Sequence, residues 1–418
     1  MTLAMKKNKY IWSVSVLLSV ALSSCNTEVD FGYEQGHPLG TTVKFSYGLS
    51  ESAGKECPDS MFVVASRVIN SWKCAMAVNT DDFLGRYIYN APEREEEKTD
   101  TVDIVEPEDT VAIEAFSWDE PDGSGNALEK FCVRSGEYKF FTFNMNEKEL
   151  VYDDIMDYLA DNTGEKKFQQ IRLEYAEYDR NDPELRDGID MEYWEDYNPY
   201  ANYVMTGLHP VFFDTTTVKN LTYGTETEIR FSPNKITQTV EIRFDIKKDF
   251  GKGAFRVDKV WAEMSGIPYK INMSRGYLDV TNTLKILFPC TLTDGNGAFA
   301  DNFDNNGTVG CWSAVEVPGF VENSSSAAVT GPGIMQIVVY VTMEDGRKRK
   351  LQGKINLYNT LRKAQTVKSV GDGKNYVKGG DKGLIEVRTV GIDAESVRTA
   401  PSGNVKTDRW ISCSSMDI

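Results

Sequence analysis

The chain has 418 residues, of which 41% are hydrophobic and 26% are charged, and its formal net charge is −17 at pH 7. This composition is that of a globular protein with a sizeable core, so it excludes a chain disordered throughout and a polytopic membrane protein. The acidic balance argues against a nucleic-acid binder, because such proteins neutralise phosphates with Lys and Arg. The length predicts two domains.

Residues 1–24 have the features of a lipoprotein signal peptide. Three lysines between residues 6 and 9 and the apolar stretch 11–22 precede Leu22-Ser23-Ser24-Cys25, which forms a lipobox. We predict that the Cys25 thiol is acylated and that Cys25 becomes the first residue of the mature chain. The lipid, with its palmitate chains, would anchor the protein to the cell outer membrane, exposed at the surface. The alternatives are an ordinary signal peptide with a chance cysteine and an uncleaved anchor, although twelve apolar residues are too few to span a bilayer as a helix.

The remainder of the chain is predicted to form two halves that differ in net charge. We expect a tether at 25–40, a first domain at 41–218 with an acidic insert at 92–126, a second domain at 219–366 and a tail at 367–418. Residues 25–218 hold 41 acidic and 16 basic side chains, whereas residues 219–418 hold 22 and 27, so the halves carry −25 and +5. This asymmetry favours two domains with different electrostatic surfaces.

Two acidic stretches raise the question of a metal site. Residues 93–122 hold thirteen acids against Arg94 and Lys98, which predicts a solvated insert. A calcium site is the alternative there, because clustered carboxylates bind a hard cation when a fixed backbone brings them together. The loop at 294–307 has three aspartates without the spacing of an EF-hand, and it is predicted to be a turn-rich connection. We assign no metal ligand to either stretch.

Most of the chain has the pattern of β-strands. Residues 237–247 alternate apolar and charged side chains, a period of two that places one face in a core and the other in water. The same alternation runs through 171–175, 269–273 and 351–357, while 334–343 is apolar on both faces, as in a central strand. Asp345-Gly346 predicts a hairpin turn after that central strand.

One segment, 149–161, has helical spacing of its apolar residues Val151, Ile155, Tyr158 and Leu159. Short strands with turn signals between them otherwise predict an all-β protein, built as two tandem antiparallel β-sandwiches with one short helix in the first domain. The tail holds a strand-like segment at 383–391. It either adds an edge strand to the second domain or pairs with another subunit.

Six cysteines follow Cys25, an even number that permits disulfides in the oxidising compartment outside the cytoplasm. None forms a CxxC pair, which argues against a zinc site and a thioredoxin-like motif. Several are expected to be buried free thiols. If one disulfide forms, Cys290 and Cys311 are favoured, because they flank a single polar loop.

The sequence holds no catalytic motif: HExxH, GxSxG and a Gly-rich phosphate loop are all missing. Its two histidines, His37 and His209, are 172 positions apart, so chemistry that needs a His cluster has few candidates. We therefore predict no enzyme activity, no catalytic residue and no cofactor. A secreted hydrolase that uses paired carboxylates is an alternative, because the fold sets their spacing.

An aromatic stretch mixed with Asp and Asn suggests a ligand platform. A sugar could stack on Tyr193, Trp194, Tyr197 and Tyr200, with Tyr203 following them. The simpler interpretation is an irregular strand whose half-buried aromatic rings pack on a sheet.

Three further stretches carry a family resemblance. They are Arg134–Asn144 (RSGEYKFFTFN), then 239–246 after Phe231-Ser232-Pro233, and 260–268, which ends in Met-Ser-Gly-Ile-Pro. Together with the lipobox, they resemble the fimbrillin-like lipoproteins of type V pili in Gram-negative anaerobes, over about residues 41–365. The resemblance implies that both sandwiches are transthyretin-like and that the chain is a stalk, tip or anchor subunit of a surface fibre. Subunits of that family join by strand addition, in which a sheet edge pairs its free N–H and C=O groups with an incoming strand.

One feature departs from the family pattern. Polymerising members are trimmed by an arginine-specific protease in an early loop, whereas the first arginine after Cys25 is Arg67, inside an apolar strand predicted at 61–69. The resemblance therefore implies an anchor or accessory subunit that keeps its lipid. Arg94, in the acidic insert, is the best early candidate for an exposed arginine.

The resemblance also implies O-glycosylation, at Asp followed by Ser or Thr and then by an aliphatic residue, Met or Thr. The acceptors would be Ser60, Thr101, Thr110 and Thr215.

The sequence supports three hypotheses about function. The leading hypothesis is a non-catalytic, lipid-anchored cell-surface protein, an anchor or accessory subunit of a type V pilus involved in adhesion. Its partners would be the membrane, through the lipid, and other pilus subunits, through strand addition. The second hypothesis is an outer-membrane lipoprotein that binds a glycan, and the third is the secreted hydrolase.

Overall fold

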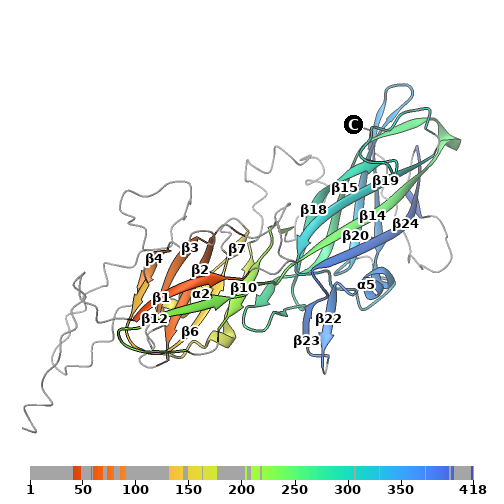
Figure 1. The fold of residues 1–418 in the computed structure, drawn as a ribbon. Coiled ribbons are helices and arrows are strands. Elements are labelled where there is room, and N and C mark those ends of the chain that lie inside the picture. The colour runs from red at the N-terminus through yellow and green to blue at the C-terminus, as the bar shows by residue number, and fades with distance from the viewer. Residues whose placement is uncertain are drawn as a thin grey trace, which may run out of the picture.

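The computed structural model describes residues 41–48, 58, 60–68, 73–79, 85–90, 131–144, 149–161, 163–176, 203–204, 209–216, 219–305, 307–328, 330–371, 373–394, 397–399 and 416–417. Its elements are nearly all strands, and they form two sandwiches placed one after the other along an elongated molecule (Figure 1). No helix in this part of the chain is long and apolar enough to cross a membrane.

The first sandwich packs a three-stranded sheet on a seven-stranded one. In the small sheet, β1 (Thr41–Tyr47) lies between β12 (Glu226–Phe231), which is parallel to it, and β5 (Phe131–Val133), which is antiparallel. The large sheet has the order β13 (Asn234–Lys235), β10 (Phe212–Thr215), β6 (Gly136–Phe143), β2 (Ser60–Arg67), β3 (Lys73–Asn79) and β4 (Gly85–Asn90), and β11 (Lys219–Leu221) also pairs with β6.

The large sheet is buried on both faces, which explains why β2 is a nearly continuous apolar run. Val63 and Ala65 of β2 pack in the cluster shared with the small sheet. Phe62 and Val64 point the other way and belong to the cluster that contains the buried face of the helix α2 (Asp153–Ala160).

A four-stranded antiparallel sheet joins the two sandwiches. Its order is β17 (Tyr277–Leu278), β16 (Lys270–Asn272), β8 (Arg172–Tyr175) and β7 (Leu150–Val151), and the 3-10 helix η2 (Phe168–Gln170) precedes β8. Strand β8 comes from the first half of the chain and β16 from the second, and they pair antiparallel. One cluster of buried apolar side chains passes through this sheet, from Phe62 to Ala394. The two sandwiches therefore share a continuous core.

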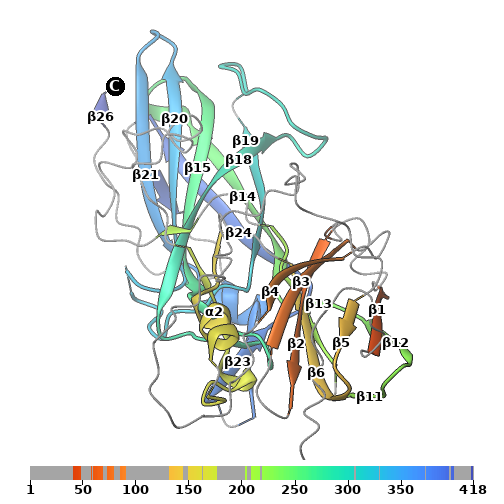
Figure 2. The same cartoon turned by 90° about the vertical axis from the view of Figure 1, so that its left-hand side faces the viewer.

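The second sandwich is built from long strands (Figure 2). They are β14 (Gln238–Asp249), β15 (Phe255–Pro268), β18 (Thr283–Thr293), β19 (Thr308–Val317), β20 (Ile334–Met343), β21 (Lys348–Asn356) and β24 (Lys382–Asp393). The short strands β9 (Tyr203–Val204), β25 (Val397–Thr399) and β26 (Met416–Asp417) pair with β18, β24 and β21. Strand β18 connects the layer that contains β15 with the layer that contains β19, because residues 283–290 pair with β15 and residues 291–293 pair with β19.

The burial of side chains along these strands agrees with the position of each strand in the sandwich. Val240, Ile242, Phe244 and Ile246 of β14 are buried, and the residues between them face outward, as the alternation predicts. All ten residues of β20 are buried, as expected for a central strand. Gly346 takes a positive φ of 84° in the turn between β20 and β21, a conformation that glycine adopts without a steric penalty.

Three small elements complete the fold. They are the 3-10 helix η3 (Phe250–Lys252), the helix α5 (Tyr358–Ala364) and the hairpin of β22 (Val367–Val370) with β23 (Asn375–Lys378), which projects beside the junction of the sandwiches in Figure 1. The helix α5 was not predicted from the sequence. Leu361 is its buried anchor, and its seven residues are too few to show a helical period clearly.

The predicted class, an all-β protein of two sandwiches with a short helix in the first, is confirmed by this architecture. Three pairs among the described strands are nevertheless parallel: β1 with β12, β14 with β24 and β9 with β18. The strand pairing also extends past the domain boundary predicted at residue 218, since β11, β12 and β13 belong to the first sandwich. A period of two shows that a segment is a strand but does not show which sheet it joins.

The strand-like segment 383–391 lies within the second sandwich. As part of β24, it pairs with β14 over ten register positions, and Ile385 and Val390 are fully buried. In this structure the segment is therefore an edge strand of its own domain rather than a strand donated to another subunit.

Candidate functional site

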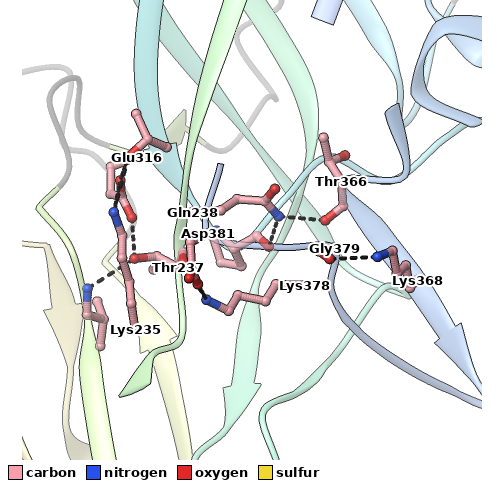
Figure 3. Close-up of polar contacts among 12 residues, drawn as sticks. Lys235, Thr237, Gln238, Glu316, Thr366, Lys368, Lys378, Gly379 and Asp381 are labelled. Carbon is pink, nitrogen blue, oxygen red and sulfur yellow. Dashed lines mark hydrogen bonds and ion pairs between the residues drawn. The ribbon is translucent and has the colours of Figure 1, made fainter. Parts of the chain in front are cut away.

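The junction between the sandwiches holds a connected network of polar side chains (Figure 3). Its centre is Glu316, at the end of β19, whose carboxylate lies 3.0 Å from Lys235 Nζ, with both side chains 8% exposed. The hydroxyls of Thr237 and Thr239 both donate to this carboxylate, the second at 2.8 Å. Lys235 lies on β13 of the first sandwich, so the ion pair joins the two sandwiches directly.

Thr237 extends this network into the first sandwich. Its hydroxyl accepts a hydrogen bond from the backbone N–H of Val211 at 3.1 Å, and Val211 precedes β10. Every polar atom of the Glu316 carboxylate thus has a partner, which a buried charge requires if it is not to destabilise the fold.

A second group of contacts fixes the β22–β23 hairpin to the same place. The side-chain amide of Gln238 donates to the carbonyls of Pro318 and Thr366, at 2.9 and 2.5 Å. Lys378 donates to the carbonyl of Thr237 at 3.2 Å and to Asp381 at 2.5 Å. Gly379 is required here, because a Cβ at this position would lie 1.9 Å from the carbonyl oxygen of Gln365.

These contacts and the shared core have one mechanical consequence. The sheet of β17, β16, β8 and β7 and the Glu316 network both cross the boundary between the sandwiches. A relative rotation of the two sandwiches would break buried hydrogen bonds and expose apolar surface. The arrangement favours a single stiff body that can transmit force along its length.

The far end of the second sandwich holds a buried ion pair that the sequence did not reveal. Lys248 Nζ lies 2.8 Å from Asp301 Oδ2, and both side chains are fully buried. Asp301 also accepts hydrogen bonds from the backbone N–H of Val257, at 2.8 Å, and from the side chain of Asn305, at 3.0 Å. The loop predicted as a turn-rich connection is such a connection, and Asp301 attaches it to β14 and β15.

A cavity of about 460 Å³ lies next to this ion pair, in the gap where β18 leaves β15 to join β19. Cys290, Leu292 and Phe299 supply its apolar wall, and Arg256, Asp258 and Lys259 supply charged groups. The Arg256 guanidinium already donates to Asp258 at 2.9 Å.

The predicted disulfide between Cys290 and Cys311 is wrong for this structure, in which both thiols are free. The two residues lie on neighbouring strands but are offset in register, since Leu292 is the residue opposite Cys311. Burial raises the pKa of both thiols, so neither is activated as a nucleophile. Cys74 is free and buried as well, in agreement with the expectation of buried thiols.

Most of the other predicted site residues lie outside the described residues. These are Cys25, Arg94, Thr101, Thr110, Tyr193, Trp194, Tyr197 and Tyr200. Arg67 lies on a strand as predicted, since it is the last residue of β2. Its guanidinium donates to the carbonyl of Ser135 at 2.8 Å. Among the described residues, no three His, Cys, Asp or Glu side chains are placed to hold a metal ion.

Two of the predicted glycosylation acceptors are described, and their surroundings differ. Thr215 is exposed at the end of β10, and its hydroxyl makes only a 3.2 Å contact to the carbonyl of Phe140 and a 3.4 Å contact to that of Thr216. Ser60 is half-buried in β2, opposite Asn79 of β3.

We expect glycosylation at Thr215 to exceed that at Ser60, because a transferase needs access to the hydroxyl. Peptide mass spectrometry of the protein from its native cells should find added hexose mass on the Thr215 peptide and little on the Ser60 peptide. Thr215→Val should remove the modification and leave the fold intact. An unmodified Thr215 peptide from native protein would overturn this expectation.

Comparison with known proteins gives only distant likenesses. No family model and no curated protein matches the sequence. Among solved structures, a candidate adhesin from Bacteroides ovatus ATCC 8483 is 9% identical, with a TM-score of 0.42 over 87% of this chain and 94% of that one. The fimbrial anchor protein Mfa2 from Porphyromonas gingivalis is 9% identical, with a TM-score of 0.35 over 89% and 95%.

A third solved structure, of candidate polysaccharide-binding proteins from Bacteroides thetaiotaomicron VPI-5482, is 8% identical, with a TM-score of 0.35 over 85% of this chain and 92% of that one. The solved structures that are similar to this chain thus include candidate adhesins and a fimbrial anchor protein.

Proposed function

We propose that this protein is a non-catalytic, lipid-anchored cell-surface protein that serves as an anchor or accessory subunit of a type V pilus. The observation that carries the proposal is the continuous core between two sandwiches, placed behind a lipobox and a short tether. A subunit that holds a fibre on a membrane must withstand tension, and a hinge between its domains would yield first. The core and the Glu316 network support a body without such a hinge.

The tether sets the distance between the membrane and the first sandwich. Residues 26–40 separate Cys25 from β1, and a fully extended chain of that length spans at most roughly 50 Å. This reach suits a protein held close to the membrane surface. The two sandwiches then extend the attachment point further outward (Figure 1).

Strand addition is the proposed route by which other subunits join. The outermost strands of the sheets in the described part of the chain include β4 and β12. The first half of β24 is also an edge, because β25 pairs with β24 only at residues 390–392. Such edges present N–H and C=O groups that an incoming strand can pair with. The helix α5 lies near β24.

The anchoring part of the proposal is tested at Cys25. Radiolabelled palmitate should label the wild-type protein in its native cells, and the labelled product should partition into the detergent phase. Cys25→Ala should lose the label, because alanine has no thiol to accept the lipid. Cys57→Ala is the matched control, and it should label like the wild type. Equal labelling of the Cys25→Ala protein would contradict the proposal.

The assembly part is tested separately on whole cells. Protease shaving should release fragments of the protein from intact cells, and a pull-down with the full chain should recover fibre subunits. A protein that is protected from shaving, or that recovers no other subunit, would not be a pilus component.

A further inference from the structure

The outer face of β14, β19 and β18 carries an exposed tryptophan. Trp312, on β19, is 39% exposed, although an indole is usually largely buried. The other large hydrophobic side chains that are exposed in the described part of the chain are Val68, Tyr223, Val370 and Leu384. We define the Trp312 face as Trp312 together with Glu241, Arg243, Asp245 and Thr291.

Strand register fixes what surrounds the indole. Trp312 lies opposite Arg243 of β14 on one side and opposite Thr291 of β18 on the other. Its neighbours on the same face of β19 are Gly310 and Ala314, because successive side chains alternate between faces. Both are small, so the indole has no bulky neighbour along its own strand.

The strand beside the indole carries charges of both signs. The outward charged residues of β14 are Glu241, Arg243, Asp245, Lys247 and Asp249, three acidic and two basic. Arg243 donates to the Glu241 carboxylate, which orients a guanidinium and a carboxylate next to the ring. Glu241 lies opposite Ala314, and Asp245 lies opposite Gly310, so hydrogen-bonding groups are present along one whole side of the indole.

We propose that the Trp312 face binds a pyranose ring of a neutral glycan. A pyranose presents polarised C–H groups on its face and hydroxyls around its rim. The C–H groups suit the electron-rich face of an indole. Each hydroxyl both donates and accepts hydrogen bonds, which matches adjacent carboxylate and guanidinium groups.

Other occupants fit this face less well. A protein partner would cover a face of roughly 800 Å² with an apolar centre. Among the described residues, the other large exposed apolar side chain near this face is Leu384, which lies opposite Glu241 on the far side of β14, so the charged row separates it from Trp312. A polyanion would need an excess of Lys and Arg, which β14 does not provide.

This inference adds an adhesive role to the proposed cell-surface function and rests on that function for its biological purpose. The binding itself is a property of the folded chain, independent of the lipid and of fibre assembly. A failure of glycan binding can therefore be told apart from a failure of anchoring, which palmitate labelling reports.

The test is affinity electrophoresis of the full-length protein through native gels that contain one polysaccharide each. The probes are yeast mannan, a soluble β-glucan, a galactan and an arabinoxylan, with heparin as the polyanion. At least one neutral polysaccharide should retard the wild type, and Trp312→Ala should weaken that binding at least tenfold. Arg243→Ala should also weaken it. Tyr223→Ala is the matched control, because it removes an aromatic ring that is 52% exposed on the other sandwich, and it should leave retardation unchanged.

Folding of each variant is checked by its melting temperature, which should stay near that of the wild type because Trp312 and Arg243 are surface residues. Three outcomes would overturn the proposal. The first is that none of the four neutral polysaccharides retards the wild type, and the second is that Trp312→Ala is retarded as strongly as the wild type. The third is that only heparin binds. Sedimentation that shows self-association of the wild type but not of Trp312→Ala would assign the face to a second copy and overturn it as well.

Discussion

A chain that ends after residue 380 should lose the second sandwich. The truncation removes β24, whose residues Ile385, Val387, Val390 and Ile392 are at most 7% exposed and pack on the core side of β14. Burial of such a side chain stabilises by about 1.5–3 kcal/mol, so the four together contribute roughly 6–12 kcal/mol. That amount is comparable with the whole stability of a typical domain, about 5–15 kcal/mol.

Thermal denaturation followed by circular dichroism measures this loss. The matched control is a chain that ends after residue 399, which keeps β24 and β25 and removes only β26 among the described strands. We expect its melting temperature to stay within a few degrees of the full chain. If the chain ending after residue 380 melted like the full protein, β24 would not be part of the fold, and the segment would again be a candidate for donation to another subunit.

The second large effect is expected from Asp301→Ala. This change leaves the ammonium group of Lys248 fully buried without its carboxylate and removes the acceptor of the Val257 N–H. Breaking a buried ion pair by removing one partner typically destabilises a protein by about 3–5 kcal/mol, because the remaining charge is neither solvated nor compensated. Urea denaturation of the variant and the wild type gives the difference in the free energy of unfolding.

Asp157→Ala is the matched control for this experiment. Asp157 also pairs with a lysine at 2.8 Å, but the side chains of Lys166 and Asp157 are 51% and 62% exposed. Exposed pairs of this kind contribute about 0–1 kcal/mol. The double variant Lys248→Met/Asp301→Leu should be less destabilised than Asp301→Ala, since it leaves no buried charge. Equal losses for Asp301→Ala and Asp157→Ala would show that the buried pair does not hold the loop.

The strand content of this protein could be predicted from its sequence because it depends on local periodicity. The alternation in 237–247 and the unbroken apolar run 334–343 became β14 and β20, and Asp345-Gly346 became the turn after β20. Each of these patterns lies within about ten residues, and burial of one or both faces of a strand is enough to impose it.

The assignment of strands to sheets could not be predicted in the same way. Strands β11 to β13 follow residue 218 yet complete the first sandwich, and β24 pairs in parallel with β14, some 140 positions earlier in the chain. A period of two is identical for a strand at the edge of one domain and a strand in the next. Which edge a strand joins depends on the free edges that the rest of the chain presents.

The candidate sites show the same difference between features encoded locally and contacts between distant segments. The sequence by itself determined the all-β class and the positions of β14 and β20, and it alone carries the prediction of a lipobox at Cys25, because each is encoded in a continuous stretch of residues. Only the tertiary structure decided that Lys235 meets Glu316, that Lys248 meets Asp301 and that Trp312 stands between Arg243 and Thr291. These partners are 81, 53, 69 and 21 positions apart in sequence, and they meet through the pairing and packing of distant segments, which no local pattern encodes.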